Sequence, residues 1–215
     1  MRWIFRLAVL AAVALSGLII VNSLPYFSGR TALAFLEEKG PLAHDPVWRA
    51  TFLGHLFGGI VCFLTAPLLF WNGLLVRFPK LHRWLGRVYG VAVLGWAGPT
   101  GLYLSFFAKG GLAGKSAFLV LGLLWWGATA RGVQLIVAKR VAEHLRWMTR
   151  SYVIALSAVF FRLYHVVFFY AGLADDPNYG LSLWLSLATS LVVGEWLVRR
   201  APAGLHPLPL KGALS

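Results

Sequence analysis

The chain has 215 residues, of which 59% are hydrophobic and only 13% are charged, and its formal net charge is +13 at pH 7. In a soluble protein this charge would suggest nucleic-acid binding. Here the basic residues are divided among short stretches that flank apolar runs. That distribution fits membrane topology and contact with anionic membrane lipids, and it excludes nucleic acid as the expected partner.

Apolar runs dominate the chain from its start to residue 198. Each run, as a helix rising ~1.5 Å per residue, is long enough to cross a hydrocarbon core of about 30 Å. Uninterrupted runs of this length exclude the strands of a transmembrane barrel. The sequence therefore predicts an all-α fold, a six-transmembrane-helix bundle that forms a single domain over 1–215 and ends in a short cytoplasmic tail at 201–215. The predicted helices are 3–24, 50–73, 84–107, 116–138, 151–173 and 180–198.

Lys and Arg gather in every second gap between these runs, and most of the acidic residues lie in the other gaps. Positive residues beside membrane helices stay on the cytoplasmic side, so we expect both termini inside and a multi-pass protein of the cell's inner membrane. The basic set is Arg2, Arg6, Arg77, Lys80, Arg83, Arg87, Lys139, Arg140, Arg146, Arg150, Arg199, Arg200 and Lys211. The opposite set holds Arg30, Lys39, Arg49, Lys109 and Lys115 with Glu37, Glu38, Asp45, Asp175 and Asp176.

The start of the chain has the charged beginning and apolar middle of a secretory signal. No small-x-small cleavage site follows, so we expect an uncleaved first helix. The single cysteine, Cys62, lies within a predicted helix, which rules out a disulfide or zinc framework. The sequence also contains no phosphate-binding loop, no dinucleotide fingerprint after a strand and no HExxH motif. Any chemistry must therefore come from polar residues within or beside the membrane.

Two histidines are expected in the outer half of the membrane, each on a face of small residues. His55 shares its face with Gly58, Gly59, Cys62 and Ala66, and His165 shares its face with Arg162, Ala158, Ala155 and Ser151. Small residues beneath a histidine permit either close helix packing or a flat cofactor between helices. Both readings stay open, and on the second one His55 and His165 are the axial ligands of a haem iron.

Arg162 lies deep in the fifth predicted helix, about 16 Å from its outer end at ~1.5 Å per residue. A charge at that depth needs a carboxylate, backbone carbonyls, water or an anionic ligand as its partner. Glu195 is the only acid within a predicted helix body, and it can instead pair with Arg199 at i+4. A structural and a ligand-binding role for Arg162 both stay open.

A second pair of histidines, His82 and His144, begins the third and fifth helices at the inner surface. Arg87 and Arg150 lie just inside the same boundary, where a guanidinium can hold a carboxylate or phosphate with two hydrogen bonds. Trp, Tyr and Arg at this level also serve as ordinary interfacial anchors. Arg131 and Gln134, near the inner end of the fourth helix, are candidates to complete a cavity with these residues.

The two helix entries, His82-Arg83-x-x-Gly86-Arg87 and His144-x-x-Trp147-Met148-x-Arg150-Ser151, resemble the bacterial predicted membrane proteins called domain of unknown function family 2306. The resemblance covers roughly 50–172. Leu145 stands where a basic residue is expected. The resemblance implies an integral membrane protein and supplies no activity. Histidines near both membrane surfaces also resemble, in architecture only, the two-haem transmembrane b-type cytochromes.

Two functions follow as expectations. The first is transmembrane electron transfer by haem b, with His55 and His165 as outer ligands, His82 and His144 at an inner haem, and Arg87 and Arg150 beside the propionates. The two histidines of the fifth helix are about 31 Å apart along the axis, which favours one haem over two. The second is a non-redox protein that binds an anionic lipid or small metabolite in an inner Arg/His cavity, as a carrier, sensor or lipid-handling protein.

Overall fold

The computed structural model describes residues 2–30 and 32–200, apart from the side chains of 2–9, 11, 12 and 72, and it contains only helices and turns in that part of the chain. The all-α prediction is confirmed. The tail predicted at 201–215 lies outside the described residues. The helices are α1 (Arg2–Ser23), η1 (Leu24–Ser28), α2 (Ala34–Lys39), η2 (Gly40–His44), α3 (Pro46–Leu69), α4 (Asn72–Arg77), α5 (Pro79–Val91), η3 (Ala92–Ala97), α6 (Gly98–Ser105), α7 (Gly111–Val137), α8 (Val141–Ala155), α9 (Ser157–Tyr170) and α10 (Asp175–Arg200).

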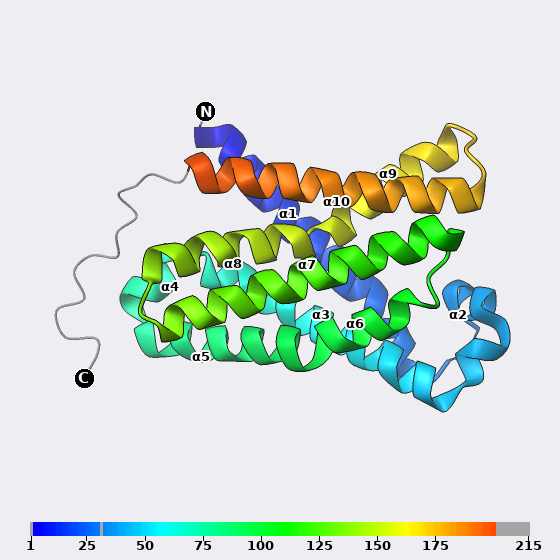
Figure 1. Ribbon diagram of the computed structural model, residues 1–215, viewed down its shortest axis with the longest axis horizontal. Coiled ribbons are helices and arrows are strands. Elements are labelled where there is room, and N and C mark those ends of the chain that lie inside the picture. Colours follow the sequence, from blue (N-terminus) through cyan, green and yellow to red (C-terminus); the bar gives the residue numbers. More distant parts are fainter. Residues whose placement is uncertain (1, 31, 201–215) are drawn as a thin grey trace.

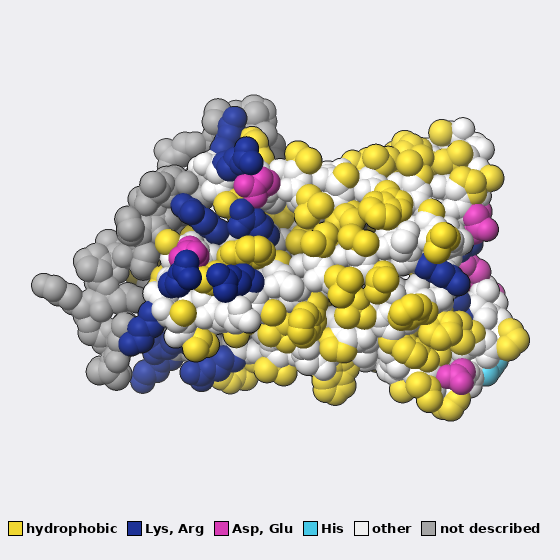
Figure 2. Space-filling view, in the orientation of Figure 1, with side chains coloured by type: hydrophobic (Ala, Val, Ile, Leu, Met, Phe, Trp, Pro, Cys, Tyr) yellow, Lys and Arg dark blue, Asp and Glu magenta, His cyan; other side chains and the backbone are white. Residues whose placement is uncertain are grey.

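The long helices run side by side along one axis and form a bundle (Figure 1). The beginnings of α1, α5 and α8 and the ends of α7 and α10 lie at one end of this bundle, called here the basic end. The short helices α2 and η2 lie at the opposite end, called here the cap end, with the beginnings of α3, α7 and α10. Lys and Arg gather at the basic end, and hydrophobic side chains cover the middle of the visible face (Figure 2).

Four helices within the described residues are long and apolar enough to cross a membrane, namely Pro46–Leu69, Gly111–Val137, Val141–Tyr170 (α8 with α9) and Asp175–Arg200. Large apolar side chains such as Val167, Phe169 and Val192 are exposed on their surfaces. Exposed apolar area of this extent is typical of a surface that contacts lipid. Of the six predicted runs, 3–24 corresponds to α1 and 84–107 to α5, η3 and α6.

The third predicted run is not one regular helix, because a π-helical turn, η3, separates α5 from α6. Pro99 follows directly and has no backbone N–H, so the regular ladder of hydrogen bonds is interrupted there. The amide of Gly98 instead donates to the Val93 carbonyl. The Leu94 carbonyl accepts from Trp126 Nε1 at 3.0 Å and the Ala97 carbonyl from His55 at 2.9 Å. Side chains of neighbouring helices thus satisfy carbonyls of the irregular turn.

The fifth predicted run is also longer and less regular than expected. The helix begins at Val141 and contains a break at Leu156, between α8 and α9, with no proline in it. The face predicted to run from Ser151 through Ala155 to His165 is therefore interrupted.

The last helix, α10, packs on α9, α8 and α7 through a stripe of small and polar residues. The stripe recurs every four residues and is buried throughout: Asn178, Ser182, Ser186, Ser190 and Gly194. Small residues let helix backbones approach closely inside a membrane. The stripe thus lets α10 pack closely on its neighbours, and Leu183 and Leu187 are buried beside it.

The segment between α1 and α3 folds into an ordered cap. Phe35 and Trp48 stack on Phe52 at centroid distances of 5.3 and 5.2 Å, and Tyr26 meets Phe52 edge to face at 5.3 Å. Leu36 and Ala43 are buried in the same cluster. The aromatic cluster fixes α2 and η2, which lie in the gap between the predicted helices 3–24 and 50–73, against the beginning of α3.

Candidate functional site

His144 is held by α7 at the basic end of the bundle. Its Nδ1 donates to the Gly132 carbonyl at 2.8 Å. One turn later, Met148 covers the Cα of Gly132, since a Cβ built there would lie 2.5 Å from the Met148 sulfur. The two motif residues therefore both contact Gly132, and no hydrogen bond is found for the His144 Nε2 within the described residues.

His82 lies opposite, on α5. The imidazoles of His82 and His144 are close enough for a charge on one to repel a charge on the other. The Nδ1 of His82 is buried and has no hydrogen-bond partner in the part of the chain that the structure describes. The two histidines thus lie within electrostatic reach of each other, one on α5 and one on α8.

Seven residues further along both helices, a buried hydroxyl network joins α5, α7 and α8. The hydroxyl oxygens of Tyr89 and Ser151 are 2.9 Å apart, and those of Ser151 and Thr129 are 2.7 Å apart. Thr129 also lies 2.9 Å from the Trp125 carbonyl, to which it can donate. All three hydroxyl residues are fully buried. The network fixes the spacing of the helices that carry the two histidines.

Arg150 faces away from this pair, toward α10. Its Nη2 and Nε donate to one carboxylate oxygen of Glu195 at 2.8 and 3.2 Å, while Arg199 binds the other oxygen at 3.1 Å. The Arg150 guanidinium also lies 5.1 Å from the centroid of the Trp147 ring. The pairing of Glu195 with Arg199 that the spacing allowed is confirmed, and Arg162 has no part in it.

A shallow groove of about 530 Å³ opens beside this ion pair, between α8 and α10. Three of its lining residues are arginines and two are glutamates, so it carries a net positive charge. The lining residues are Glu143, Arg146, Trp147, Arg150, Glu195, Val198 and Arg199. They come from the beginning of α8 and the end of α10, which lie at the basic end of the bundle (Figure 1).

The other predicted residues of an inner cavity do not line this groove. Arg87 is exposed on α5, and no hydrogen bond or ion pair is found for it within the described residues. Arg131 is exposed on α7, where its Nη1 lies 3.4 Å from the side-chain oxygen of Gln134. The predicted Arg/His cavity is therefore divided into the histidine pair and the groove.

His55 is packed against η3 and α6. Besides bonding to Ala97, its ring lies over Gly101, where a Cβ would come within 2.8 Å of the His55 Cε1. The small face beneath it serves helix packing, because a Cβ on Gly58 would lie 2.9 Å from the Ala97 Cβ. Its Nε2 is not used in these contacts.

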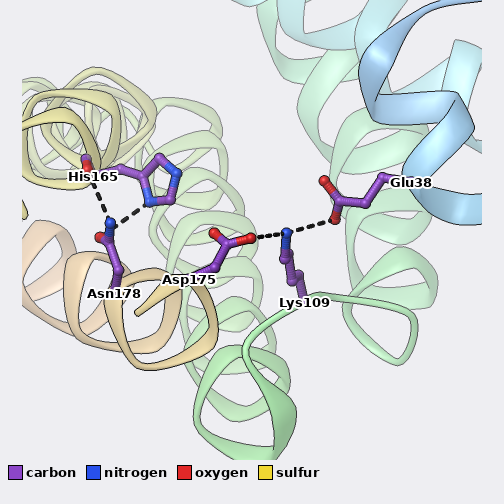
Figure 3. A network of polar contacts seen from close by, with 5 residues as sticks. All are labelled: Glu38, Lys109, His165, Asp175 and Asn178. Carbon is purple, nitrogen blue, oxygen red and sulfur yellow. Dashed lines mark hydrogen bonds and ion pairs between the residues drawn. The ribbon is translucent and has the colours of Figure 1, made fainter. Parts of the chain in front are cut away.

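His165 has a different environment, at the junction of α9 and α10 (Figure 3). Its Nδ1 donates to the Asn178 side-chain oxygen at 3.1 Å, and the Asn178 amide donates back to the His165 carbonyl at 3.1 Å. The ring stacks on Phe161 and meets Tyr179 edge to face. His55 and His165 are thus each bound by separate neighbours, because α3 packs on α5, η3 and α6 whereas α9 packs mainly on α10.

Lys109 ties together the loops of the cap end (Figure 3). It binds Asp175 at 2.6 Å and Glu38 at 3.1 Å, and so joins the beginning of α10 to α2. The hydrogen bond to Asp175 raises the pKa of Lys109 above its ordinary value of 10.5. Lys39 reinforces this tie by donating to the Phe107 carbonyl at 2.8 Å.

Sequence reasoning missed Asn178 and Lys109. The predicted helix starts at 180, which places Asn178 in a loop. In the structure α10 begins five residues earlier, at Asp175, and includes Asn178. The serine repeat at every fourth position after Asn178 was a readable signal for that face. Lys109 carried no signal beyond being a basic residue in a gap with acids.

Arg162 lies on the exposed side of α9, eight residues before the helix ends at Tyr170. Its Nη1 donates to the Ala158 carbonyl at 2.8 Å. The depth is about 12 Å at ~1.5 Å per residue, less than the depth predicted from a helix ending at residue 173.

The family resemblance is confirmed by comparison with protein-family models. Residues 52–198 match the model described as predicted membrane protein DUF2306, which is more than half of the chain. The match extends beyond the predicted 50–172 and includes most of α10. The chain matches none of the curated proteins and none of the solved structures with which it was compared. The chain therefore belongs to the DUF2306 family of predicted membrane proteins.

Proposed function

We propose that the chain crosses the inner membrane six times, with the basic end in the cytoplasm. Two arguments support the two crossings beyond the four apolar helices. Helix α1 runs beside them, and α5, η3 and α6 form a further rod of the same bundle (Figure 1). The concentration of Lys and Arg at the basic end supports the orientation.

The function that we infer is binding of an anionic lipid headgroup at the cytoplasmic surface, in the groove between α8 and α10. One observation carries this proposal: Arg146, Arg150 and Arg199 line one groove together with Trp147. Guanidinium groups bind phosphate through paired hydrogen bonds, and an indole ring lies favourably at the headgroup level.

The charges of the groove are not fully used within the protein. Arg150 and Arg199 share Glu195, whereas no partner is found for Arg146 among the described residues. Glu143 is bound by Arg140. Arg146 is therefore the groove cation that is free to hold a phosphate.

Lipid retention in native mass spectrometry tests the proposal. The wild-type protein, Arg146→Gln and Arg77→Gln are each reconstituted with phosphatidylglycerol and phosphatidylcholine. Arg77 is the matched control, because it lies at the basic end but not in the groove. We expect Arg146→Gln to retain phosphatidylglycerol about fivefold less, since one cation near an anionic surface contributes ~1 kcal/mol. Equal retention by all three proteins overturns the proposal.

Competition with a soluble ligand distinguishes binding of a lipid from binding of a small metabolite. Glycerol phosphate carries the same phosphate without acyl chains. If it displaces phosphatidylglycerol at micromolar concentration, the groove recognises a soluble anion, and the lipid proposal fails. If millimolar glycerol phosphate leaves lipid retention unchanged, the acyl chains are part of what is bound.

Haem-based electron transfer is the second candidate, favoured by the inner histidine pair. In metal sites a ligating histidine donates its other ring N–H to a carbonyl, as His144 does to Gly132. Haem bound there would supply one-electron redox chemistry, with His82 and His144 as its ligands. Arg150 is bound to Glu195 on α10, which leaves Arg87, for which no partner is found among the described residues, as the candidate for a propionate. A reduced-minus-oxidised visible spectrum of the purified protein tests this candidate, and His144→Ala should abolish any band.

A further inference from the structure

Residues 195–200, called here the last turns of α10, are held differently from the rest of that helix. The buried stripe of α10 stops at Gly194, where an added Cβ would lie 3.9 Å from the Arg150 Cα. None of the residues after Gly194 is fully buried. Packing therefore contributes less here, and side-chain bonds decide how firmly the last turns lie on α8.

Arg150 and Glu195 form the only ion pair that joins α8 to α10 in the part of the chain that the structure describes. Both side chains are partly exposed, at 28% and 40%. An ion pair that is open to water contributes little to stability. The last turns of α10 are thus tied to α8 by a weak bond, and both of its partners line the groove.

Each partner of this bond has a second contact on its own helix. Glu195 is also bound by Arg199 at 3.1 Å, four residues further along α10. The Arg150 guanidinium lies against the Trp147 ring, 5.1 Å from its centroid, which holds the charge over α8. If another anion replaces Glu195 at Arg150, neither charge is left without a partner.

Helix α8 alone offers two guanidinium groups to such an anion. Arg146 and Arg150 are four residues apart, so they project from one face of α8 into the groove. Glu195 meets both donors of Arg150 with a single carboxylate oxygen. A phosphate can instead offer two oxygens to the same guanidinium fork, which is the stronger arrangement.

We propose that a headgroup phosphate in the groove binds Arg146 and Arg150, displaces Glu195 and releases the last turns of α10 from α8. This inference rests on the proposed function of the groove and adds that the position of α10 responds to the bound lipid. Because such coupling is reciprocal, release of α10 and binding of the headgroup favour each other. The groove would then act as a sensor of anionic lipid.

Hydrogen–deuterium exchange tests this inference on the full chain in nanodiscs of phosphatidylcholine, with and without phosphatidylglycerol. We expect the amides of 195–200 to exchange about fivefold faster with phosphatidylglycerol, since loss of an exposed ion pair shifts an opening equilibrium by about this much. The amides of 182–190, within the buried stripe, should exchange at the same rate in both lipids.

Four variants separate release of α10 from a general effect of the lipid. Glu195→Gln should exchange fast at the last turns of α10 in both lipids, because its tie is already broken. Glu143→Gln is the matched control: it also removes a groove acid, but Glu143 is bound by Arg140, three residues earlier in the chain. Its exchange in phosphatidylcholine should stay slow. Arg146→Gln should lose the response to phosphatidylglycerol, and Arg77→Gln should keep it.

Lipid retention in native mass spectrometry, measured on the same proteins, separates this inference from the proposed function. If phosphatidylglycerol is retained but 195–200 exchange at one rate in both lipids, release of α10 is overturned and the groove remains a binding site. Exchange of Glu195→Gln as slow as that of wild type overturns it as well. If phosphatidylglycerol is not retained, the groove and the release of α10 are both contradicted.

Discussion

Arg150 on α8 and Glu195 on α10 join the two walls of the groove, with both Nη2 and Nε of the arginine directed at one carboxylate oxygen. Arg199 holds the other oxygen, so a single carboxylate occupies two guanidinium groups. Glu195 therefore competes with any anion that enters the groove for the guanidinium groups of Arg150 and Arg199.

Removing this competitor should strengthen anion binding. Glu195→Gln releases both arginines and removes one negative charge, so we expect affinity for phosphatidylglycerol vesicles to rise about fivefold. Glu37→Gln, at the cap end, is the control and should have no effect. Unchanged or weaker binding by Glu195→Gln would contradict the role of the groove. Vesicle flotation at two salt concentrations measures the affinity, and higher salt should reduce the difference.

The hydroxyl network predicts an order of destabilisation. Tyr89→Phe removes one hydrogen bond and leaves Ser151 bonded to Thr129, at a cost of about 1 kcal/mol. Ser151→Ala removes both bonds and takes from the buried Tyr89 hydroxyl its partner Ser151, which should cost about 1–3 kcal/mol. Unfolding in detergent measures both, with Ser116→Ala as the control, because the hydrogen bond of Ser116 to the Ala113 carbonyl is exposed. Equal stability of Ser151→Ala and wild type would contradict the network.

Two glycines provide a matched comparison for the contact with His55. At Gly101 a Cβ would lie 3.0 Å from the His55 Nδ1, so Gly101→Ala must displace the ring from the Ala97 carbonyl. We expect a loss of about 1–3 kcal/mol. At Gly59 no atom lies within 4 Å of the added Cβ, and Gly59→Ala should be neutral or stabilising. The same unfolding assay checks both variants, and a reversed order would rule out this packing of His55.

The Lys109 tie should make a small contribution to stability, because its partners are partly exposed. Lys109→Met should cost at most ~1 kcal/mol and expose the α2 segment to proteolysis, whereas Lys115→Met should do neither. Since the pKa of Lys109 is raised, its contribution is complete below pH 10.5 and is lost as pH rises through the raised value. The difference in proteolysis rate between Lys109→Met and wild type should therefore be the same at pH 7 and at pH 9. A difference between Lys109→Met and wild type that appears only at pH 9 would contradict this assignment.

Hydropathy alone predicted the existence of the long helices but not their basic beginnings. α8 begins at Val141, ten residues before the predicted start at 151, because its first turns contain Glu143, His144, Arg146 and Arg150. These charges lower the hydropathy, yet they do not prevent helical hydrogen bonding. His144 and Met148 nevertheless lie on one face of α8 and both contact Gly132, since a spacing of four residues keeps one face wherever the helix begins.

The partners of the outer histidines were not predictable from their spacing. The contact of His55 depends on the π-helical turn near Pro99, which turns the Ala97 carbonyl toward α3. The contact of His165 depends on α10 beginning early enough to carry Asn178. A sequence gives the approximate depth of a residue in a membrane, whereas the neighbouring helix that it faces follows from packing.

The most direct measurement for the central claim is photo-crosslinking with phosphatidylglycerol that carries a photoreactive headgroup, followed by peptide mapping. We expect the label on peptides containing residues 143–150 and 195–199, and we expect unlabelled phosphatidylglycerol, but not phosphatidylcholine, to compete for it. Arg146→Gln should reduce labelling of these peptides about fivefold, by the loss of one cation near the headgroup. Labelling spread evenly over the other basic peptides, such as 77–87, or unaffected by Arg146→Gln, would contradict headgroup binding in the groove.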